Sequence, residues 1–184
     1  MTPEEVLLEV LTLLEGLGCS YMITGSFAGN VHGIPRATQD ADVVVEADRA
    51  RLESFLKELK GTFYVSPEAA RDALARESMF NIIHLDTGFK IDLIFRKSRP
   101  FSKEEFRRRR QISFHGRLLW FTSPEDTILS KLEWSKLGSS ERQFQDALSV
   151  ARLQGEKLDA VYLKKWADPL GVRDLLNDLL SGKK

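Results

Sequence analysis

The sequence has very little cysteine and histidine. Cys19 is the only cysteine among 184 residues, so the chain cannot form an internal disulfide, and a reducing, cytoplasmic setting is expected. The three histidines, His32, His84 and His115, show no metal-type spacing with Cys19. A metal site of the Cys/His kind is therefore not expected.

An excess of one charge and a long apolar run are also missing. The 27 basic residues balance the 27 acidic ones, so whole-chain charge gives no argument for nucleic acid or an anionic surface. No apolar stretch approaches the roughly 20 residues of a membrane helix, and the first residues are acidic rather than basic. The composition, 42% apolar and 29% charged, is that of a soluble compact chain, and no membrane partner is expected.

Local patterns predict an α+β fold with a helical C-terminal half. Helical periodicity follows a capping-box pattern at Thr2 and stops at Gly18, and a strong helix start recurs at Ser123. Between them, the strand-type runs are Ser20–Thr24, Asp40–Glu46, Phe80–Leu85, Phe89–Phe95 and an edge ribbon within Gln111–Phe121, with helices at 26–33, 52–59 and after Ser66. We expect a core over residues 1–122 and a helical region over 123–184 packed on it.

Two aspartates stand at the start of a valine-rich strand. Asp40 and Asp42 lie two residues apart, so a strand directs both carboxylates to one side and Ala41 and Val43 to the other. Two ionised carboxylates about 4 Å apart would repel by roughly 4 kcal/mol at an effective dielectric near 20. This repulsion predicts a counter-cation, and hard oxygen ligands favour Mg²⁺ or Mn²⁺ completed by substrate phosphates.

A third acid and a Gly-Ser turn extend the pattern. Asp92 interrupts the apolar strand from Phe89 to Phe95 and is a candidate third metal ligand that orients the attacking group; alternatively, it pairs with Lys90 or caps an edge. Gly25 and Ser26 precede a predicted helix, where backbone N–H groups attract phosphate and glycine permits close approach. An ordinary strand-to-helix turn is the alternative for these two residues.

These residues resemble the signature of the DNA-polymerase-β-like nucleotidyltransferase superfamily. The matching positions are Thr24 in a hydrophobic slot, Gly25-Ser26, a thirteen-residue spacer, Asp40-Ala41-Asp42 and Asp92. More narrowly, the strings His32-Gly33, Arg36-x-Thr38 and Ser123-Pro124-Glu125-Asp126-x-Ile128-x-x-Lys131-Leu132 look like the AbiEii-type and related uncharacterised bacterial nucleotidyltransferases. The resemblance implies a nucleotidyltransferase-type mixed or antiparallel sheet and transfer of a nucleotide from an NTP.

Three further residues are assigned to nucleotide binding. The resemblance matches Lys131 and Asp146 to C-terminal Lys and Asp motifs and implies that Lys131 contacts the triphosphate, although a lysine beside an apolar face can also extend to water. Asp146 follows Arg142 by four residues, so a surface pair is its alternative. Arg36 either clamps a phosphate or forms a salt bridge with Asp40.

The only concentrated charge run is Arg107, Arg108, Arg109 and Arg110. Most such runs are solvated, but four contiguous arginines are also suited to the phosphates of an RNA acceptor. The predicted function is Mg²⁺-dependent nucleotidyl transfer to an unidentified acceptor (RNA, protein or a small molecule such as an antibiotic), with a toxin–antitoxin role and an antitoxin partner as further expectations. The alternative is a non-catalytic nucleotide- or partner-binding module with the same fold.

Overall fold

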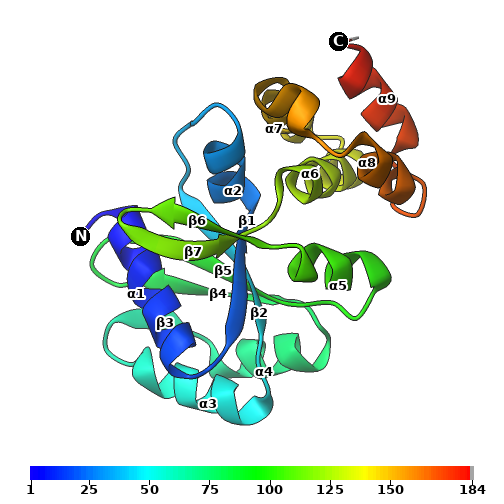
Figure 1. The fold of residues 1–184 in the computed structure, drawn as a ribbon. Helices are drawn as coiled ribbons and strands as arrows, with labels where there is room; N and C mark the ends of the chain where they lie inside the picture. The colour runs from blue at the N-terminus through cyan, green and yellow to red at the C-terminus, as the bar shows by residue number, and fades with distance from the viewer. Residues whose placement is uncertain (183–184) are drawn as a thin grey trace. The chain divides into compact units, whose positions relative to one another are not determined.

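The computed structural model describes residues 1–182, and within them strands and helices alternate up to Phe121 and only helices follow (Figure 1). The helices are α1 (Pro3–Gly16), α2 (Gly25–His32), α3 (Arg49–Glu58), α4 (Pro67–Ala75), α5 (Pro100–Arg107), α6 (Pro124–Gly138), α7 (Glu141–Gln154), α8 (Ala160–Ala167) and α9 (Arg173–Ser181), with a 3-10 turn at Gly155–Lys157. The strands are β1 (Ser20–Thr24), β2 (Asp40–Glu46), β3 (Phe63–Val65), β4 (Met79–His84), β5 (Lys90–Phe95), β6 (Arg110–Phe114) and β7 (Arg117–Phe121). The predicted α+β class is confirmed. None of these described helices combines the length and apolar character needed to span a membrane.

The strands form one mixed sheet in the order β3-β4-β5-β2-β1-β7-β6. The pairs β2–β5 and β1–β7 are parallel, and the other neighbours are antiparallel. The hairpin after residue 110 was expected as an edge ribbon, but only β6 lies at the edge. Strand β7 pairs with β1 through Ile23 and Phe121 and so extends the sheet.

Strand β2 lies between β1 and β5, and its side chains point alternately to an apolar face and to a polar face of the sheet. Ala41, Val43 and Val45 alternate with Asp40 and Asp42 and are at most 3% exposed. Burial of one valine side chain stabilises the folded state by about 1.5–3 kcal/mol. The alternation along β2 therefore determines which face of the sheet packs against helices.

Helices α1 and α3 cover the apolar face. Val45 of β2 and Phe95 of β5 line one small apolar space together with Leu14 of α1 and Phe55 of α3. Because side chains alternate along a strand, the acids of β2 point to the opposite face.

Two short elements were not predicted from the sequence. Strand β3 has three residues and forms the edge beside β4. Helix α5 begins with Pro100 and buries Phe101 and Phe106, with one serine and three charged residues between them. An eight-residue helix with two buried aromatic side chains is too short to show a clear helical period.

The described chain divides into two compact units. The first contains residues 1–26 and 38–121, and the second contains residues 27–37 and 122 onwards. The predicted division into 1–122 and 123–184 stays a prediction, but the structure groups the segment 27–37 with the helical unit. Within that unit, the Ile34 backbone N–H donates to Ser149 Oγ at 2.8 Å, and Gln154 Nε2 donates to the His32 carbonyl at 2.8 Å.

Helix α6 of the second unit begins at a buried capping site. Ser123 Oγ accepts from the Asp126 backbone N–H at 3.1 Å and donates to Asp126 Oδ2 at 2.6 Å. The Tyr162 hydroxyl of α8 donates to Asp126 Oδ1 at 2.6 Å. The helix start predicted at Ser123 is confirmed, and Asp126 also joins α6 to α8.

We predict that Gly33→Ala destabilises the second unit by about 1–3 kcal/mol through overpacking. An added Cβ would lie 2.9 Å from the Gly29 carbonyl oxygen, 2.9 Å from Ser149 Oγ and 3.1 Å from a Val150 methyl group. Urea unfolding followed by circular dichroism measures the change. Gly16→Ala is the control, because a Cβ at Gly16 meets nothing within 4 Å; similar losses for both variants would contradict this packing.

Candidate functional site

A row of polar residues crosses four neighbouring strands of the sheet. Thr24 of β1 pairs with Asp42 of β2, Asp42 pairs with Asp92 of β5, and Asn81 of β4 pairs with Asp92. Residues paired in this way point to the same side of a sheet. The register therefore brings Asp42 and Asp92 together on the face opposite the valines.

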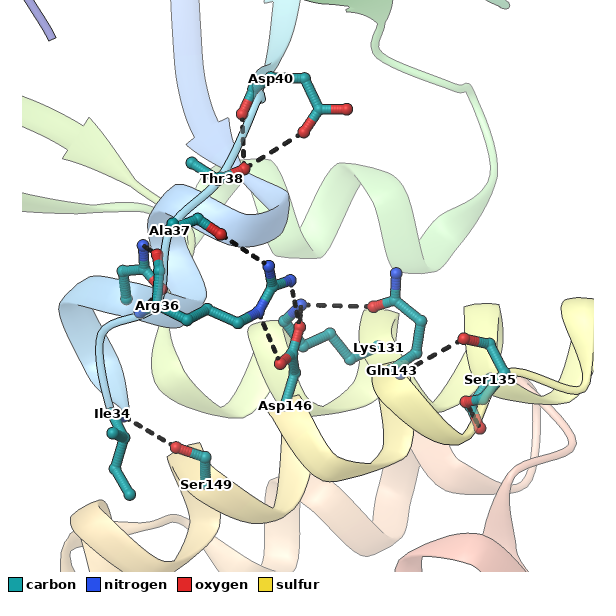
Figure 2. Close-up of polar contacts among 12 residues, drawn as sticks. Ile34, Arg36, Ala37, Thr38, Asp40, Lys131, Ser135, Gln143, Asp146 and Ser149 are labelled. Carbon is teal, nitrogen blue, oxygen red and sulfur yellow. Dashed lines mark hydrogen bonds and ion pairs between the residues drawn. The ribbon is translucent and has the colours of Figure 1, made fainter. Parts of the chain in front are cut away.

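Asp40 lies at the first position of β2 on the same face. Its side chain is 41% exposed, whereas that of Asp92 is only 7% exposed. Thr38 Oγ1 donates to the Asp40 carbonyl oxygen at 3.0 Å and lies 3.3 Å from Asp40 Oδ1 (Figure 2). The acids thus extend from a solvated strand end to a buried interior position.

Lys90 pairs with two of the three acids. Its Nζ donates to Asp92 Oδ2 at 2.6 Å and lies 3.6 Å from Asp40 Oδ2. The hydrogen bond with Asp92 raises the pKa of Lys90 above its usual range, so the ammonium stays charged. The alternative considered for Asp92, an ion pair with Lys90, is present in the structure.

One oxygen of Asp92 is left for a ligand. Asp92 Oδ1 is buried and has no hydrogen-bond partner, and a buried acceptor without a partner costs about 1–3 kcal/mol. Among residues 1–182, no three Cys, His, Asp or Glu side chains are arranged closely enough to hold a metal ion as they stand. A preformed three-acid cage is therefore not present, and the three-ligand metal site stays a prediction.

Gly25 packs directly against Asp42. It has φ of +62°, and a Cβ added there would lie 1.9 Å from Asp42 Oδ2. No residue with a side chain fits this position, and Gly25 and Ser26 are the first two residues of α2. The donor set, two or three carboxylates beside a backbone that approaches closely, fits Mg²⁺ or Mn²⁺, which take one or two carboxylates and complete their coordination with phosphate oxygens.

A groove of about 710 Å³ adjoins this face. Its lining includes Thr38 before β2, Asp40 at the first position of β2, Thr87 and Phe89 from the β4–β5 turn, and Lys90 of β5. Pockets for small ligands are typically about 300–1,000 Å³. The groove is therefore large enough for a small molecule or for part of a larger one.

The other three predicted binding residues form an ion cluster in the helical unit. Arg36 binds Asp146 through two parallel hydrogen bonds, Nε to Oδ1 at 3.0 Å and Nη2 to Oδ2 at 2.8 Å (Figure 2). Lys131 Nζ donates to Asp146 Oδ2 at 2.9 Å and to Gln143 Oε1 at 3.3 Å. The Lys131 side chain is 5% exposed, so it points inward, and no ion pair joins Asp146 to Arg142 among the described residues.

Burial and pairing act in opposite directions on Asp146. Burial alone favours its neutral form, but the hydrogen bonds from Arg36 and Lys131 outweigh it and hold the Asp146 pKa below its usual range. Asp146 is thus ionised at neutral pH and shared by two cations. Its two oxygens both have partners, unlike those of Asp92.

The arginine run is divided among different environments. Arg107 pairs with Glu104 on the surface of α5, and Arg110 is an exposed residue at the start of β6. The Arg109 guanidinium lies over the rings of Phe106 and Trp120, 4.3 and 4.8 Å from their centroids, and burial lowers the Arg109 pKa. Arg107, Arg109 and Arg110 thus lie in different environments, and RNA binding through the four arginines stays a prediction.

Sequence reasoning missed the role of two members of the polar row, Thr24 and Asn81, and part of the role of Lys90. Thr24 was assigned only to a hydrophobic slot, and Asn81 was not singled out, because their opposition to Asp42 and Asp92 depends on strand register. Lys90 was noted only as a possible partner of Asp92. The sequence signal for the contact between Lys90 and Asp40 was that Lys90 precedes Asp92 by two residues, which places both side chains on one face of a strand. The parallel β2–β5 pair then sets Lys90 opposite Asp40.

Comparison with known structures shows a nucleotidyltransferase-like fold. The antibiotic-resistance factor ANT(2'')-Ia, solved in complex with adenylyl-2''-tobramycin, aligns over 94% of this chain and 99% of its own, with a TM-score of 0.60 and 15% identity. An antigenic nucleotidyltransferase-like protein from Paracoccidioides brasiliensis aligns over 97% and 91%, with a TM-score of 0.60 and 17% identity. The lincosamide antibiotic adenylyltransferase LnuA, bound to lincomycin, aligns over 82% and 97%, with a TM-score of 0.56 and 14% identity.

At these identities the likeness concerns the fold alone. No protein-family profile matches the sequence, and a search of curated proteins finds no sequence relative. The fold-level part of the resemblance is confirmed, and the narrower AbiEii-type assignment stays a prediction.

We predict that Gly25→Ala is more destabilising than its backbone conformation alone explains. The left-handed conformation costs an alanine about 1–2 kcal/mol, and the contact with Asp42 adds about 1–3 kcal/mol. Gly116→Ala is the matched control, because Gly116 has φ of +77° and open space around its missing Cβ. Thermal and urea unfolding measure both variants.

A double variant isolates the contact with Asp42. Adding Asp42→Ala to Gly25→Ala should recover part of the lost stability, because it removes the atoms that clash with the new Cβ. Additive losses in the double variant would contradict the close approach of Gly25 to the carboxylate.

We predict that Asp146→Asn destabilises the protein by about 3 kcal/mol at pH 7, because it leaves the buried Lys131 ammonium without its carboxylate. The folded-state pKa of Asp146 is lowered, so its contribution is complete above the unfolded pKa of about 3.9 and is lost as the pH falls below that value. Urea unfolding at pH 7 and near pH 3 measures the difference between variant and wild type.

Asp168→Asn is the control for this ion cluster. Asp168 pairs with Arg173 in the same unit, but its side chain is 47% exposed, so the loss should stay below about 1 kcal/mol. Equal losses for the two variants, or a loss for Asp146→Asn that does not shrink in acid, would contradict the assigned role.

Proposed function

We propose that this chain is a metal-dependent nucleotidyltransferase that transfers a nucleotide from a nucleoside triphosphate to an acceptor and releases pyrophosphate. The observation that carries the proposal is the register that sets Asp42 beside Asp92, with Gly25 turned against the Asp42 carboxylate. The nucleotidyltransferase-like fold supports it, and Asp42, Asp92 and Gly25 are among the residues that the sequence resemblance assigns to this chemistry.

Asp40, Asp42 and Asp92 are the proposed ligands of Mg²⁺ or Mn²⁺. A bound divalent ion would neutralise phosphate charge and polarise the reacting oxygens. The unpaired Oδ1 of Asp92 supports this assignment, because a carboxylate oxygen without a hydrogen bond is available to a cation or to the hydroxyl of an acceptor.

The reaction is an in-line substitution at phosphorus. The acceptor oxygen forms a bond to the α-phosphorus while the bond from that phosphorus to the bridging oxygen breaks, and pyrophosphate leaves with the electron pair. Asp92 accepts a hydrogen bond from the acceptor hydroxyl and takes its proton. Gly25 and Ser26 hold the triphosphate through the backbone at the start of α2 and the Ser26 hydroxyl.

The acceptor is proposed to approach through the groove that contains Asp40 and Lys90. Its volume of about 710 Å³ supports a small molecule or the end of a macromolecule, and the proposal covers RNA, protein and small-molecule acceptors alike. The toxin–antitoxin role and the antitoxin partner rest on the narrower sequence resemblance alone and remain predictions.

A second, separate proposal concerns residues of the helical unit that contact the triphosphate. Contact between Lys131 and the triphosphate, with Arg36 and Asp146 assisting, follows from the sequence resemblance. Its support in the structure is the sharing of one carboxylate by two cations, which leaves net positive charge in the Arg36, Lys131 and Asp146 cluster.

A second candidate function is a nucleotide- or partner-binding module without catalysis. The observation in its favour is Lys90, whose ammonium satisfies Asp92 Oδ2 and lies 3.6 Å from Asp40 Oδ2. A module would bind nucleotide without transferring it.

We predict that purified protein with Mg²⁺ and NTPs labelled on the α-phosphate transfers label to a component of cell extract, and that Asp92→Ala lowers this transfer at least a hundredfold. Removal of a group that acts on the transferred proton typically costs a factor of about 10²–10⁴. Gel and chromatographic separation of macromolecular and small-molecule fractions measures the label and identifies the class of acceptor. Asp72→Ala is the control, because Asp72 is an exposed acid that pairs with Arg76.

Thermal unfolding separates the two candidate functions. Ligand at a hundred times its Kd stabilises the folded state by about 2.7 kcal/mol, so Mg²⁺ with nucleotide should raise the Tm of wild type by several degrees and that of Asp42→Asn much less. A Tm shift without label transfer under any NTP would favour the module. Equal shifts for wild type and Asp42→Asn would overturn the metal site.

A further inference from the structure

Lys90 lies between two of the three acids. In the parallel β2–β5 pair it lies opposite Asp40, and it precedes Asp92 by two residues on β5, so all three side chains share one face. Its Nζ lies 2.6 Å from Asp92 Oδ2 and 3.6 Å from Asp40 Oδ2. One ammonium thus connects the buried Asp92 with Asp40, which is partly exposed at the end of its strand.

This ammonium uses the lone pairs that a metal ion would need. Asp92 Oδ2 is engaged by Lys90, while Oδ1 of the same carboxylate is buried without a partner. Among residues 1–182 the acids are not gathered into a set of three that can hold a metal. Lys90 lies between two of them, and an ammonium and a divalent cation on the same pair of carboxylates would repel each other.

Building on the proposed function, we propose that Lys90 is a resident counter-cation that divalent metal must displace from Asp92 and Asp40. Without metal, Lys90 holds the two carboxylates on adjacent strands together and offsets their repulsion. When metal binds, the ammonium leaves and the carboxylates become available as ligands. Lys90 is thus a positioning residue that lowers the affinity for free metal and keeps the site ordered before metal arrives.

The groove can accommodate the Lys90 ammonium after it is displaced from the carboxylates. Lys90 lines the space of about 710 Å³ next to Asp40, together with Thr38, Thr87 and Phe89. Its side chain is already 36% exposed, so Nζ can turn into the groove by rotating its flexible stem and become solvated. No rearrangement of β5 is required, because the four-carbon stem provides the movement.

The test is the affinity for Mn²⁺ without nucleotide, measured by the electron paramagnetic resonance signal of free Mn²⁺. Lys90→Gln removes the charge and should bind Mn²⁺ at least tenfold more tightly than wild type, with a lower metal-free Tm because the carboxylates are no longer neutralised. Lys90→Arg keeps the charge and should bind within about threefold of wild type. Lys97→Gln is the control, because Lys97 is an exposed lysine just beyond β5, and it should change neither quantity.

A second measurement uses wild-type protein and does not depend on a variant that folds. Lys90 should react with an amine-acetylating reagent at least threefold faster in saturating Mn²⁺ than without metal, relative to Lys97 in the same sample. Peptide mass spectrometry gives both rates. An unchanged ratio in saturating Mn²⁺ would overturn the displacement.

The outcomes separate this inference from the proposed function. If folded Lys90→Gln binds Mn²⁺ as wild type does, or more weakly, the displacement is wrong while the metal site stands. If neither protein binds Mn²⁺ at millimolar concentration, the metal site is wrong, and the proposed function and this inference fall together.

Discussion

The pairing of β2 with β1 on one side and β5 on the other is the constraint on which the candidate site depends. Its register sets Thr24, Asp42 and Asp92 in one row, while burial of Ala41 and Val43 orients the strand. A slip of one residue would bury the acids under the helices and expose the valines. Hydrophobic burial on one face therefore decides where the chemistry on the other face can occur.

Two acids with little exposure, Asp92 at 7% and Asp146 at 15%, are neutralised in contrasting ways. Both carboxylate oxygens of Asp146 accept hydrogen bonds from cations, Arg36 and Lys131. Burial alone would raise the Asp146 pKa, but these hydrogen bonds lower it. Asp92 has one oxygen bound to Lys90 and the other without a partner. A fully satisfied carboxylate stabilises the fold, whereas a half-satisfied one retains capacity for a ligand, and this difference is the reason that Asp92 is the proposed ligand-binding acid.

Local signals in the sequence predicted most helices and strands because they depend on neighbouring residues. The caps at Thr2, Ser66 and Ser123 are all present, since a hydroxyl that accepts from a backbone N–H three residues later needs no distant partner. Strand β3, helix α5 and the parallel β1–β7 pair were missed or misplaced. Strand β3 and the β1–β7 pair depend on pairing with other segments, which a local pattern does not contain. Helix α5 is too short to show a clear helical period.

The sequence by itself determined the alternation of Asp40 and Asp42 with Ala41 and Val43 along β2, the glycine at the start of α2 and the acid within β5, because these are periodic or local properties. Only the tertiary structure decided that Lys90 lies between Asp40 and Asp92, and that Asp146 binds Arg36 and Lys131 rather than Arg142. Strand order and helix packing choose the partners of a charged side chain. The energy of an ion pair depends on the distance and burial that this packing creates.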